Sequence, residues 1–103
     1  MFVVTVLYPA TEGAGFDFDY YAKTHLKLVQ DRWGPLGLTS LTAIRGTGTP
    51  DRAPPPYVAI ATLTWESAQE FRAAAKAHGA EIFGDIPNFT PIAAITQFSE
   101  TLA

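Results

Sequence analysis

Two segments of the chain, residues 2–8 (FVVTVLY) and 57–65 (YVAIATLTW), are rich in β-branched and aromatic residues, which is typical of β-strands. A strand in an open sheet that is covered on one face alternates apolar with polar residues. Here apolar side chains dominate both faces of both predicted strands. We therefore expect both faces of the sheet to be covered, one by helices and the other by a second copy of the same sheet.

Two further segments, residues 38–45 (LTSLTAIR) and 92–98 (IAAITQF), also have the composition of strands. Residues 46–56 (GTGTPDRAPPP) contain too many glycines and prolines for regular structure. They predict a long, exposed hairpin loop between two strands. Residues 84–91 (GDIPNFTP) predict a turn-rich loop before the last strand.

The stretch FDFDYYAKTHLKLVQDRW, residues 16–33, predicts an amphipathic helix. Asp17 or Asp19 can cap it, because a carboxylate there accepts bonds from unpaired backbone N–H groups. Gly34 and Pro35 follow its expected end. The stripe that this helix would bury consists of Phe18, Tyr21, Ala22, His25, Leu28 and Val29, with Trp33 just beyond.

A second helix is predicted directly after the third strand. Ser67 and Glu70 have the spacing of a capping box, in which each side chain bonds the backbone N–H of the other residue. We expect this helix to run to about His78 and to end at Gly79, since glycine is the usual residue just beyond a helix.

The predicted order of elements is βαββαβ, which indicates a ferredoxin-like α+β fold. Its four-stranded antiparallel sheet would carry both helices on one face. The length of 103 residues fits a single domain, residues 1–103. Because the strands are apolar on both faces, we expect two such sheets to pack face to face as a dimeric α/β barrel, which makes the protein a homodimer.

The composition narrows the classes of partner. Charged residues make up only 17% of the chain, which suits a surface partly covered by another subunit. The net charge of −3 and the lack of a basic run argue against nucleic-acid binding. The absence of cysteine excludes disulfides, thiolate metal sites and a cysteine nucleophile. No apolar run approaches the roughly 18 residues of a membrane span, and the N-terminus does not resemble a signal peptide. We expect a cytoplasmic protein without membrane contact.

His25 is the principal candidate for a catalytic residue, because it lies in the middle of a stripe that the first helix should bury. Three interpretations remain open from the residues alone. The ring can be packed in the core and hydrogen-bonded to a backbone carbonyl or a tyrosine. It can face the surface. It can also line a pocket between helix and sheet, where its near-neutral pKa suits proton transfer.

Four other residues are candidates for substrate binding. Tyr8 ends the first strand, where it can border a pocket or an interface. Tyr21 precedes His25 by four residues and therefore shares its helix face. Asp85 and Asn88 lie in the loop 84–91, where such residues commonly fix a turn through bonds to the backbone.

Metal and cofactor sites have little support in the sequence. The two histidines, His25 and His78, are far apart and form no HxxxH or HxH pair. No G-x-G-x-x-G motif follows a strand, and no GxSxG elbow is present. We therefore expect neither a metal nor a cofactor.

Three stretches in combination resemble the EthD-like family, named from the degradation of ethyl tert-butyl ether. The stretches are YPATEGAGFDFDYYAKTHLKLV, PPPYVAI and GDIPNFT, and the resemblance covers nearly the whole chain. The opening carries Tyr-Pro at the end of the first strand, then the aromatic and acidic helix start FDFDYY, then Thr-His. Two positions depart from the pattern: Lys27 stands where proline is expected, and Pro91 where an acidic residue is expected.

The resemblance implies a ferredoxin-like fold assembled as a dimeric α/β barrel. It implies a pocket around His25, Tyr8 and the loop from Asp85 to Asn88. Related barrels include cofactor-independent monooxygenases, isomerases and polyketide cyclases that act on small, mostly apolar molecules. The EthD-like group itself is usually classed with oxidoreductases.

Two functions of different classes follow. The first is an enzyme in which His25 moves a proton on a small apolar or aromatic substrate, while Tyr8 or Tyr21 orients a carbonyl or phenol. Such an enzyme would be a cofactor-independent monooxygenase, or an isomerase or cyclase. The second is a protein that binds an apolar metabolite without turning it over, which the small number of ionisable groups favours. A dimer with a vestigial pocket is a third possibility.

Overall fold

The computed structural model describes residues 1–102. Its sheet consists of β1 (Phe2–Pro9), β2 (Leu38–Arg45), β3 (Tyr57–Trp65) and β4 (Ile95–Glu100). The first helical region consists of α1 (Phe18–Tyr20), a π-helical turn η1 (Tyr21–His25), α2 (Leu26–Trp33) and the 3-10 turn η2 (Gly34–Leu36). The second consists of α3 (Ala68–Gly84) and the 3-10 turn η3 (Ile86–Asn88). The strand order is β2-β3-β1-β4, and every neighbouring pair is antiparallel. The predicted ferredoxin-like βαββαβ fold is confirmed.

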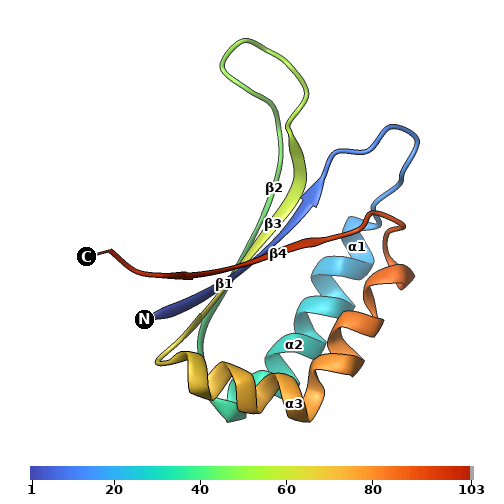
Figure 1. The fold of residues 1–103 in the computed structure, drawn as a ribbon. Helices are drawn as coiled ribbons and strands as arrows, with labels where there is room; N and C mark the ends of the chain where they lie inside the picture. Colours follow the sequence, from blue (N-terminus) through green and yellow to red (C-terminus); the bar gives the residue numbers. More distant parts are fainter. Residues whose placement is uncertain (103) are drawn as a thin grey trace.

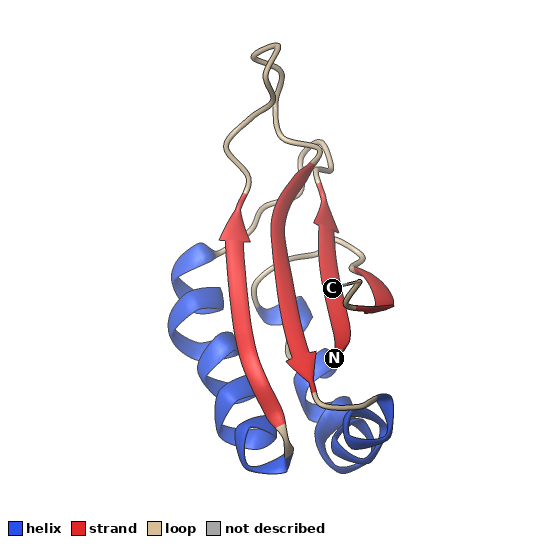
Figure 2. Cartoon of the chain, turned by 90° about the vertical axis from the view of Figure 1, so that its left-hand side faces the viewer, coloured by secondary structure: helices blue, strands red, loops and turns tan. Residues whose placement is uncertain are grey.

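Both helical regions lie on the same side of the sheet (Figure 1). The opposite face of the sheet is turned to the viewer in Figure 2, with the helices behind it. The loop between β2 and β3 extends beyond the sheet as an arm (Figure 1), as its glycines and prolines predict. Within residues 1–102, no helix is both long enough and apolar enough to cross a membrane.

The first helical region is not regular, and its irregularity lies at the candidate site. Asp17 caps the helix, its side chain accepting the N–H of Tyr20 at 3.0 Å. The N–H of Leu26 then bonds the carbonyl of Tyr21, which is the i→i+5 pattern of a π-helix. The wider turn shifts the buried stripe. As a result Ala22, predicted to be buried, is exposed, while Tyr21 and His25 are both buried.

The second helix corrects one sequence prediction. Ser67 caps it as predicted, accepting the N–H of Glu70 at 3.3 Å, but the helix continues past Gly79 to Gly84. Gly79 is buried in mid-helix, and Ile82 is buried one turn further on. Burial of that extra apolar turn outweighs the roughly 1 kcal/mol that a glycine costs in a helix interior.

The last strand begins three residues later than predicted, at Ile95 instead of Ile92. Thr90 holds the preceding segment away from the sheet. Its hydroxyl donates to the carbonyl of Gly15 at 2.7 Å and accepts the N–H of Ile92 at 3.2 Å. Ile92 is still buried, so it contributes to the core from a loop and not from a strand.

The core lies between the helices and the inner face of the sheet. Its sheet side includes Leu38 from β2, Val4, Val6 and Tyr8 from β1, and Ala59, Ala61, Leu63 and Trp65 from β3, all buried. Side chains alternate between the two faces of a strand, so the residues between them belong to the outer face. Those of β1 and β3 are apolar residues and threonines, and they are half-buried.

Candidate functional site

His25 is buried on the inner side of the helical layer, with only 5% of its surface exposed. Its Nδ1 atom lies 2.9 Å from Oδ2 of Asp85, which follows α3. A carboxylate only accepts hydrogen bonds, so Nδ1 carries the proton and Nε2 keeps its lone pair in the neutral ring. Within residues 1–102, no hydrogen bond is made by Nε2. The ring is thus held by a hydrogen bond at Nδ1, while Nε2 has no hydrogen-bond partner in the described residues.

The Asp85 carboxylate accepts three side-chain hydrogen bonds. Besides His25, the hydroxyl of Tyr20 donates to Oδ1 at 2.7 Å, and the side-chain amide of Asn88 donates to Oδ1 at 2.9 Å. Tyr20 and His25 come from the first helical region, while Asp85 precedes η3 and Asn88 is its last residue. This network therefore connects the two helical regions and fixes the orientation of the imidazole.

The electrostatics favour a neutral histidine beside an ionised carboxylate. Burial lowers the pKa of the His25 imidazole below its ordinary value, and the bond to Asp85 opposes this shift without reversing it. Burial raises the pKa of the Asp85 carboxyl, but hydrogen bonds from Asn88, Tyr20 and His25 outweigh burial and hold it below its usual value. At neutral pH, His25 is consequently a free base.

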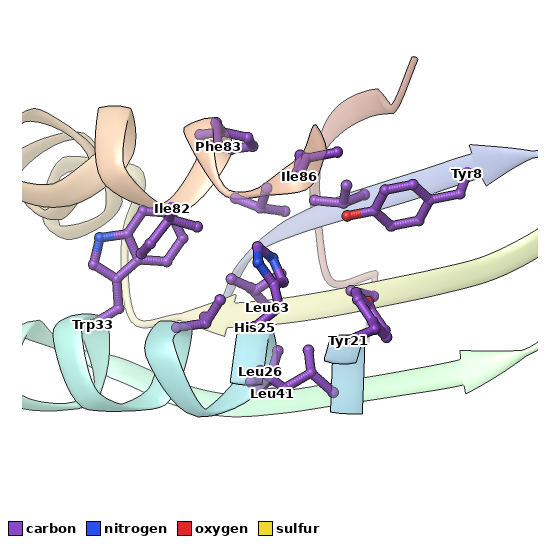
Figure 3. Close-up of a pocket in the computed structure, with 14 residues that line it drawn as sticks. Tyr8, Tyr21, His25, Leu26, Trp33, Leu41, Leu63, Ile82, Phe83 and Ile86 are labelled. Carbon is purple, nitrogen blue, oxygen red and sulfur yellow. The ribbon is translucent and has the colours of Figure 1, made fainter. Parts of the chain in front are cut away.

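A narrow cavity lies between the helices and the inner face of the sheet (Figure 3). Most of its wall is apolar, including Val4, Val6, Leu26, Val29, Leu41, Ala61, Leu63, Ile82, Phe83 and Ile86. Its polar groups are the His25 ring, the hydroxyls of Tyr8 and Tyr21, and the Trp33 indole N–H, which donates to the carbonyl of Ala74 at 2.9 Å. The volume of this cavity is only ≈ 20 Å³, which is room for about one water molecule.

The two tyrosines of the cavity remain protonated at neutral pH and can donate hydrogen bonds. Burial raises the pKa of Tyr21 to about 12, and burial together with the proximity of Tyr21 raises that of Tyr8 further. In Figure 3 the Tyr8 hydroxyl points toward the middle of the cavity, where the His25 ring lies. The Tyr21 ring stacks on the His25 ring, with centroids 5.6 Å apart and planes at 14°.

The structure brings together His25, Tyr8 and Tyr21, which all line the cavity. Asp85 and Asn88 do not line the cavity. Asp85 contacts His25 directly, and Asn88 is connected to the histidine through its bond to Asp85. Asn88 donates to the Asp85 side chain, which differs from the side-chain to backbone bond that its turn position suggested. In residues 1–102, no group of three His, Asp or Glu side chains is arranged to hold a metal ion.

Three aromatic residues around His25 were not recognised from the sequence. Phe89 lies against the His25 ring, with centroids 4.7 Å apart, and also against Tyr8, at 5.8 Å. Phe16 contacts Tyr8 edge-on at 5.3 Å. Tyr20, which was not among the candidates from the sequence, supports the site by its bond to Asp85. Tyr20 and Tyr21 are adjacent at the junction of α1 and the π-turn, so their side chains point in different directions.

Comparison with solved structures identifies the relatives of this chain. A crystal structure of an EthD-like protein from Ralstonia eutropha is 42% identical, covers 99% of this chain and 92% of its own, and superposes with a TM-score of 0.90. The chain belongs to the EthD-like family. A second EthD family structure, from Bacillus halodurans, is 20% identical over 99% of both chains with a TM-score of 0.72. No protein-family model matches the sequence, and no curated protein sequence does.

More distant structures share the EthD-like fold alone. SnoaB from Streptomyces nogalater, a cofactor-independent oxygenase, is 14% identical over 99% of this chain and 92% of its own, with a TM-score of 0.60. A dimeric ferredoxin-like protein from an uncultured marine organism is 9% identical over 100% of this chain and 96% of its own, with a TM-score of 0.57.

The two positions that depart from the EthD-like pattern lie away from the cavity. Lys27 is exposed on α2, where its Nζ pairs with Asp31 at 2.8 Å. Pro91 is exposed in the loop before β4. The cavity wall contains neither residue.

Proposed function

We propose that this EthD-like protein is an enzyme that transfers a proton on a small, mostly apolar substrate, with His25 as the catalytic base. The single observation that carries the proposal is the contact of 2.9 Å between His25 Nδ1 and Asp85 Oδ2 on the wall of an apolar cavity. A buried histidine that served packing alone would need no carboxylate partner held by two further side chains. The proposal explains why the chain places a charged group there.

The proposed step is a simple proton transfer. The Nε2 lone pair of His25 takes a proton from a C–H or O–H bond of the substrate, and the electron pair of that bond stays on the substrate. Asp85 stabilises the imidazolium that results, and the Tyr8 or Tyr21 hydroxyl donates to the oxygen where negative charge develops. General base catalysis of this kind contributes about 10²–10⁴ in rate.

Two outcomes are open to the deprotonated substrate. Return of the proton to a different atom makes the protein an isomerase or cyclase. Addition of molecular oxygen to the carbanion forms a substrate peroxide, which takes a proton back from the His25 imidazolium. The peroxide then loses water at the same carbon, so that one oxygen atom remains as a carbonyl and the substrate supplies the two electrons. This chemistry would make the protein a cofactor-independent monooxygenase, the activity class suggested by fold relatives such as SnoaB. We favour the oxygenase, and consumption of oxygen with turnover separates it from the isomerase.

A second candidate is a protein that binds an apolar metabolite without chemistry. The observation that favours it is the composition of the cavity wall, which is mostly apolar and contains His25 as its one histidine, with no Asp, Glu, Lys or Arg. Such a binder would protect or deliver its ligand. It would have no turnover, and replacement of His25 would leave ligand binding intact.

We also propose that the protein is a homodimer joined through the outer face of the sheet. One row of this face, Ile44, Ile60, Leu7 and Ile95 in register across all four strands, is entirely apolar. Ile44 and Ile95 at its ends are 57% and 50% exposed. The next row, Thr42, Thr62, Thr5 and Gln97, is uncharged. A face without charges and with exposed isoleucines suits a second copy of itself, and a fold relative is described as dimeric.

Hydrogen–deuterium exchange of substrate protons tests the proposed enzyme. We would follow the methyl signals of acetophenone, 2′-hydroxyacetophenone and 4-acetylbenzoate in D2O by NMR. The native protein should accelerate exchange for at least one ketone, and His25→Gln should lower that acceleration by about 10²–10⁴. His78→Gln, which changes the half-buried histidine of α3 outside the cavity, is the matched control and should exchange normally. Equal exchange with His25→Gln, or no acceleration of any ketone, would contradict the proposal.

A further inference from the structure

A second hollow adjoins the cavity at the end of the sheet where β2 finishes. It is larger, with ≈ 160 Å³ open to a water-sized sphere, and it is more open to solvent. Small side chains create it: Ala43 of β2 pairs with Ala61 of β3, whereas the preceding inner row pairs Leu41 with Leu63. Where leucines give way to alanines, the sheet fills less of the space beneath the helices.

One cation borders this apolar hollow. Arg45, the last residue of β2, pairs with Ala59, which is buried on the inner face. Partners in register point to the same face, so Arg45 lies on the helix side of the sheet. Its guanidinium stacks over the Phe18 ring, 4.0 Å from the centroid. Among residues 1–102, no carboxylate forms an ion pair with it.

The hollow and the cavity share a wall formed by Tyr21 and Leu26. Tyr21 is 4% exposed, and its hydroxyl is buried without a hydrogen-bond partner in the described part of the chain. A buried hydroxyl left unpaired costs about 1–3 kcal/mol. A ligand that entered from the hollow would offer this hydroxyl the partner that the protein itself does not supply.

The strands set the separation of the polar groups. Arg45, Ala59 and Tyr8 form one inner row across β2, β3 and β1. Neighbouring strands lie about 4.8 Å apart, so the backbones of Arg45 and Tyr8 are separated by about 10 Å. On the sheet itself, only Ala59 lies between them in this row. That distance suits a molecule with one aromatic ring, an anionic group at one end and the reacting group at the other.

We propose that the hollow binds the carboxylate of an aromatic or similarly apolar acid, with Arg45 as the residue that recognises the charge. The inference rests on the proposed function, because it orients the substrate of the same site. The apolar body of the acid lies over Ala43 and Ala59, and its far end passes Tyr21 toward His25. The chain carries a net charge of −3, so an anion is attracted by this local cation and not by the protein as a whole.

Measurements of ligand binding test this inference independently of catalysis. Phenylacetate and its neutral isostere 2-phenylacetamide would be titrated into the full chain, with dissociation constants taken from chemical-shift changes in two-dimensional NMR. We expect tighter binding of phenylacetate, and shifts at Arg45, Ala59 and Tyr21. Arg45→Gln should weaken phenylacetate binding about tenfold, as expected for a charge-assisted bond at a partly exposed site, and change 2-phenylacetamide by less than about twofold. Arg72→Gln on the exposed side of α3 is the control and should change neither dissociation constant.

Three results would overturn the inference. Equal affinity of the native protein for the acid and the amide, or no binding of either, would exclude a carboxylate site. An equal loss of affinity for both ligands in Arg45→Gln would show that Arg45 has a structural role and does not recognise the carboxylate. The native protein is also tested for deuterium exchange of the ketones, so that binding and proton transfer are measured separately. Retained binding with no deuterium exchange in the native protein would refute the proposed enzyme and leave the carboxylate site standing.

Discussion

His25 Nδ1 lies 2.9 Å from Asp85 Oδ2, and the two residues are 60 positions apart in the sequence. The contact joins the π-turn of the first helical region to the end of α3. Because the carboxylate also accepts bonds from Tyr20 and Asn88, it is held in place independently of the histidine. The pair therefore presents a neutral imidazole in one orientation, with Nε2 left for a ligand.

Asp85→Asn should impair both stability and proton transfer. The amide keeps the size of the side chain but loses the charge that receives three hydrogen bonds. We expect the free energy of unfolding to fall by about 1–3 kcal/mol, measured by urea denaturation. Asp85 raises the pKa of His25, so the His25 pKa should fall further in this variant. An unchanged His25 pKa and unchanged deuterium exchange would show that Asp85 does not position the ring.

The pH dependence of activity and of stability should both follow His25. Its pKa in the folded protein is below the ordinary 6.5, so the unfolded chain binds more protons between the two values. Stability is then complete above pH 6.5 and decreases as the pH falls through the folded pKa. Asp85, whose pKa is also lowered, adds a second loss below its ordinary 3.8. Deuterium exchange should rise with pH through the His25 pKa and then level off. A rate that falls as pH rises through this range would contradict a histidine base.

Tyr21→Phe should affect stability and binding in opposite directions. Removal of a buried, unpaired hydroxyl relieves its desolvation, so the free energy of unfolding should stay the same or increase by about 1 kcal/mol. Ligand binding and exchange should weaken, because the substrate loses a hydrogen-bond donor. Thermal unfolding and the phenylacetate titration measure the two effects. A large loss of stability would instead indicate a structural hydroxyl.

Ile60→Lys should separate the proposed dimer. Ile60 is in register with Leu7 and Ile44 in the apolar row of the outer face, and a charge there would be buried between two sheets. Light scattering after size-exclusion chromatography should give a dimer mass for the native protein and a monomer mass for the variant. Ala77→Lys, on the exposed side of α3, should remain dimeric. A native monomer, or a variant that remains a dimer, would contradict this interface.

The sequence predicted the layers of the fold because strand composition and helix periodicity are local signals. The bounds of β2 and β3 are confirmed, and so is the Ser67 cap. The prediction that the second helix ends at Gly79 was wrong. Glycine favours a helix end locally, but burial of Ile82, which depends on the tertiary structure, continues the helix. The π-turn at Tyr21 could not be predicted, since no residue type requires it.

The candidate site was predictable in its location but not in its connections. A histidine on an apolar stripe predicted a buried ring, and His25 is buried. Asp85 was placed in a turn near the pocket, yet its bond to His25 depends on where α3 ends, and α3 ends five residues later than Gly79 suggested. Arg45 gave no signal in the sequence, because only the strand register places it beside Ala59.

The protonation state of the His25 ring nitrogens tests the central claim most directly. Long-range ¹H–¹⁵N NMR spectra of the native protein, recorded across a pH titration, distinguish the two neutral tautomers from the imidazolium. We predict a neutral ring at pH 7 with the proton on Nδ1, an unprotonated Nε2, and a pKa below 6.5. A ring that carries its proton on Nε2, or that is fully protonated at pH 7, would contradict a base held ready by Asp85.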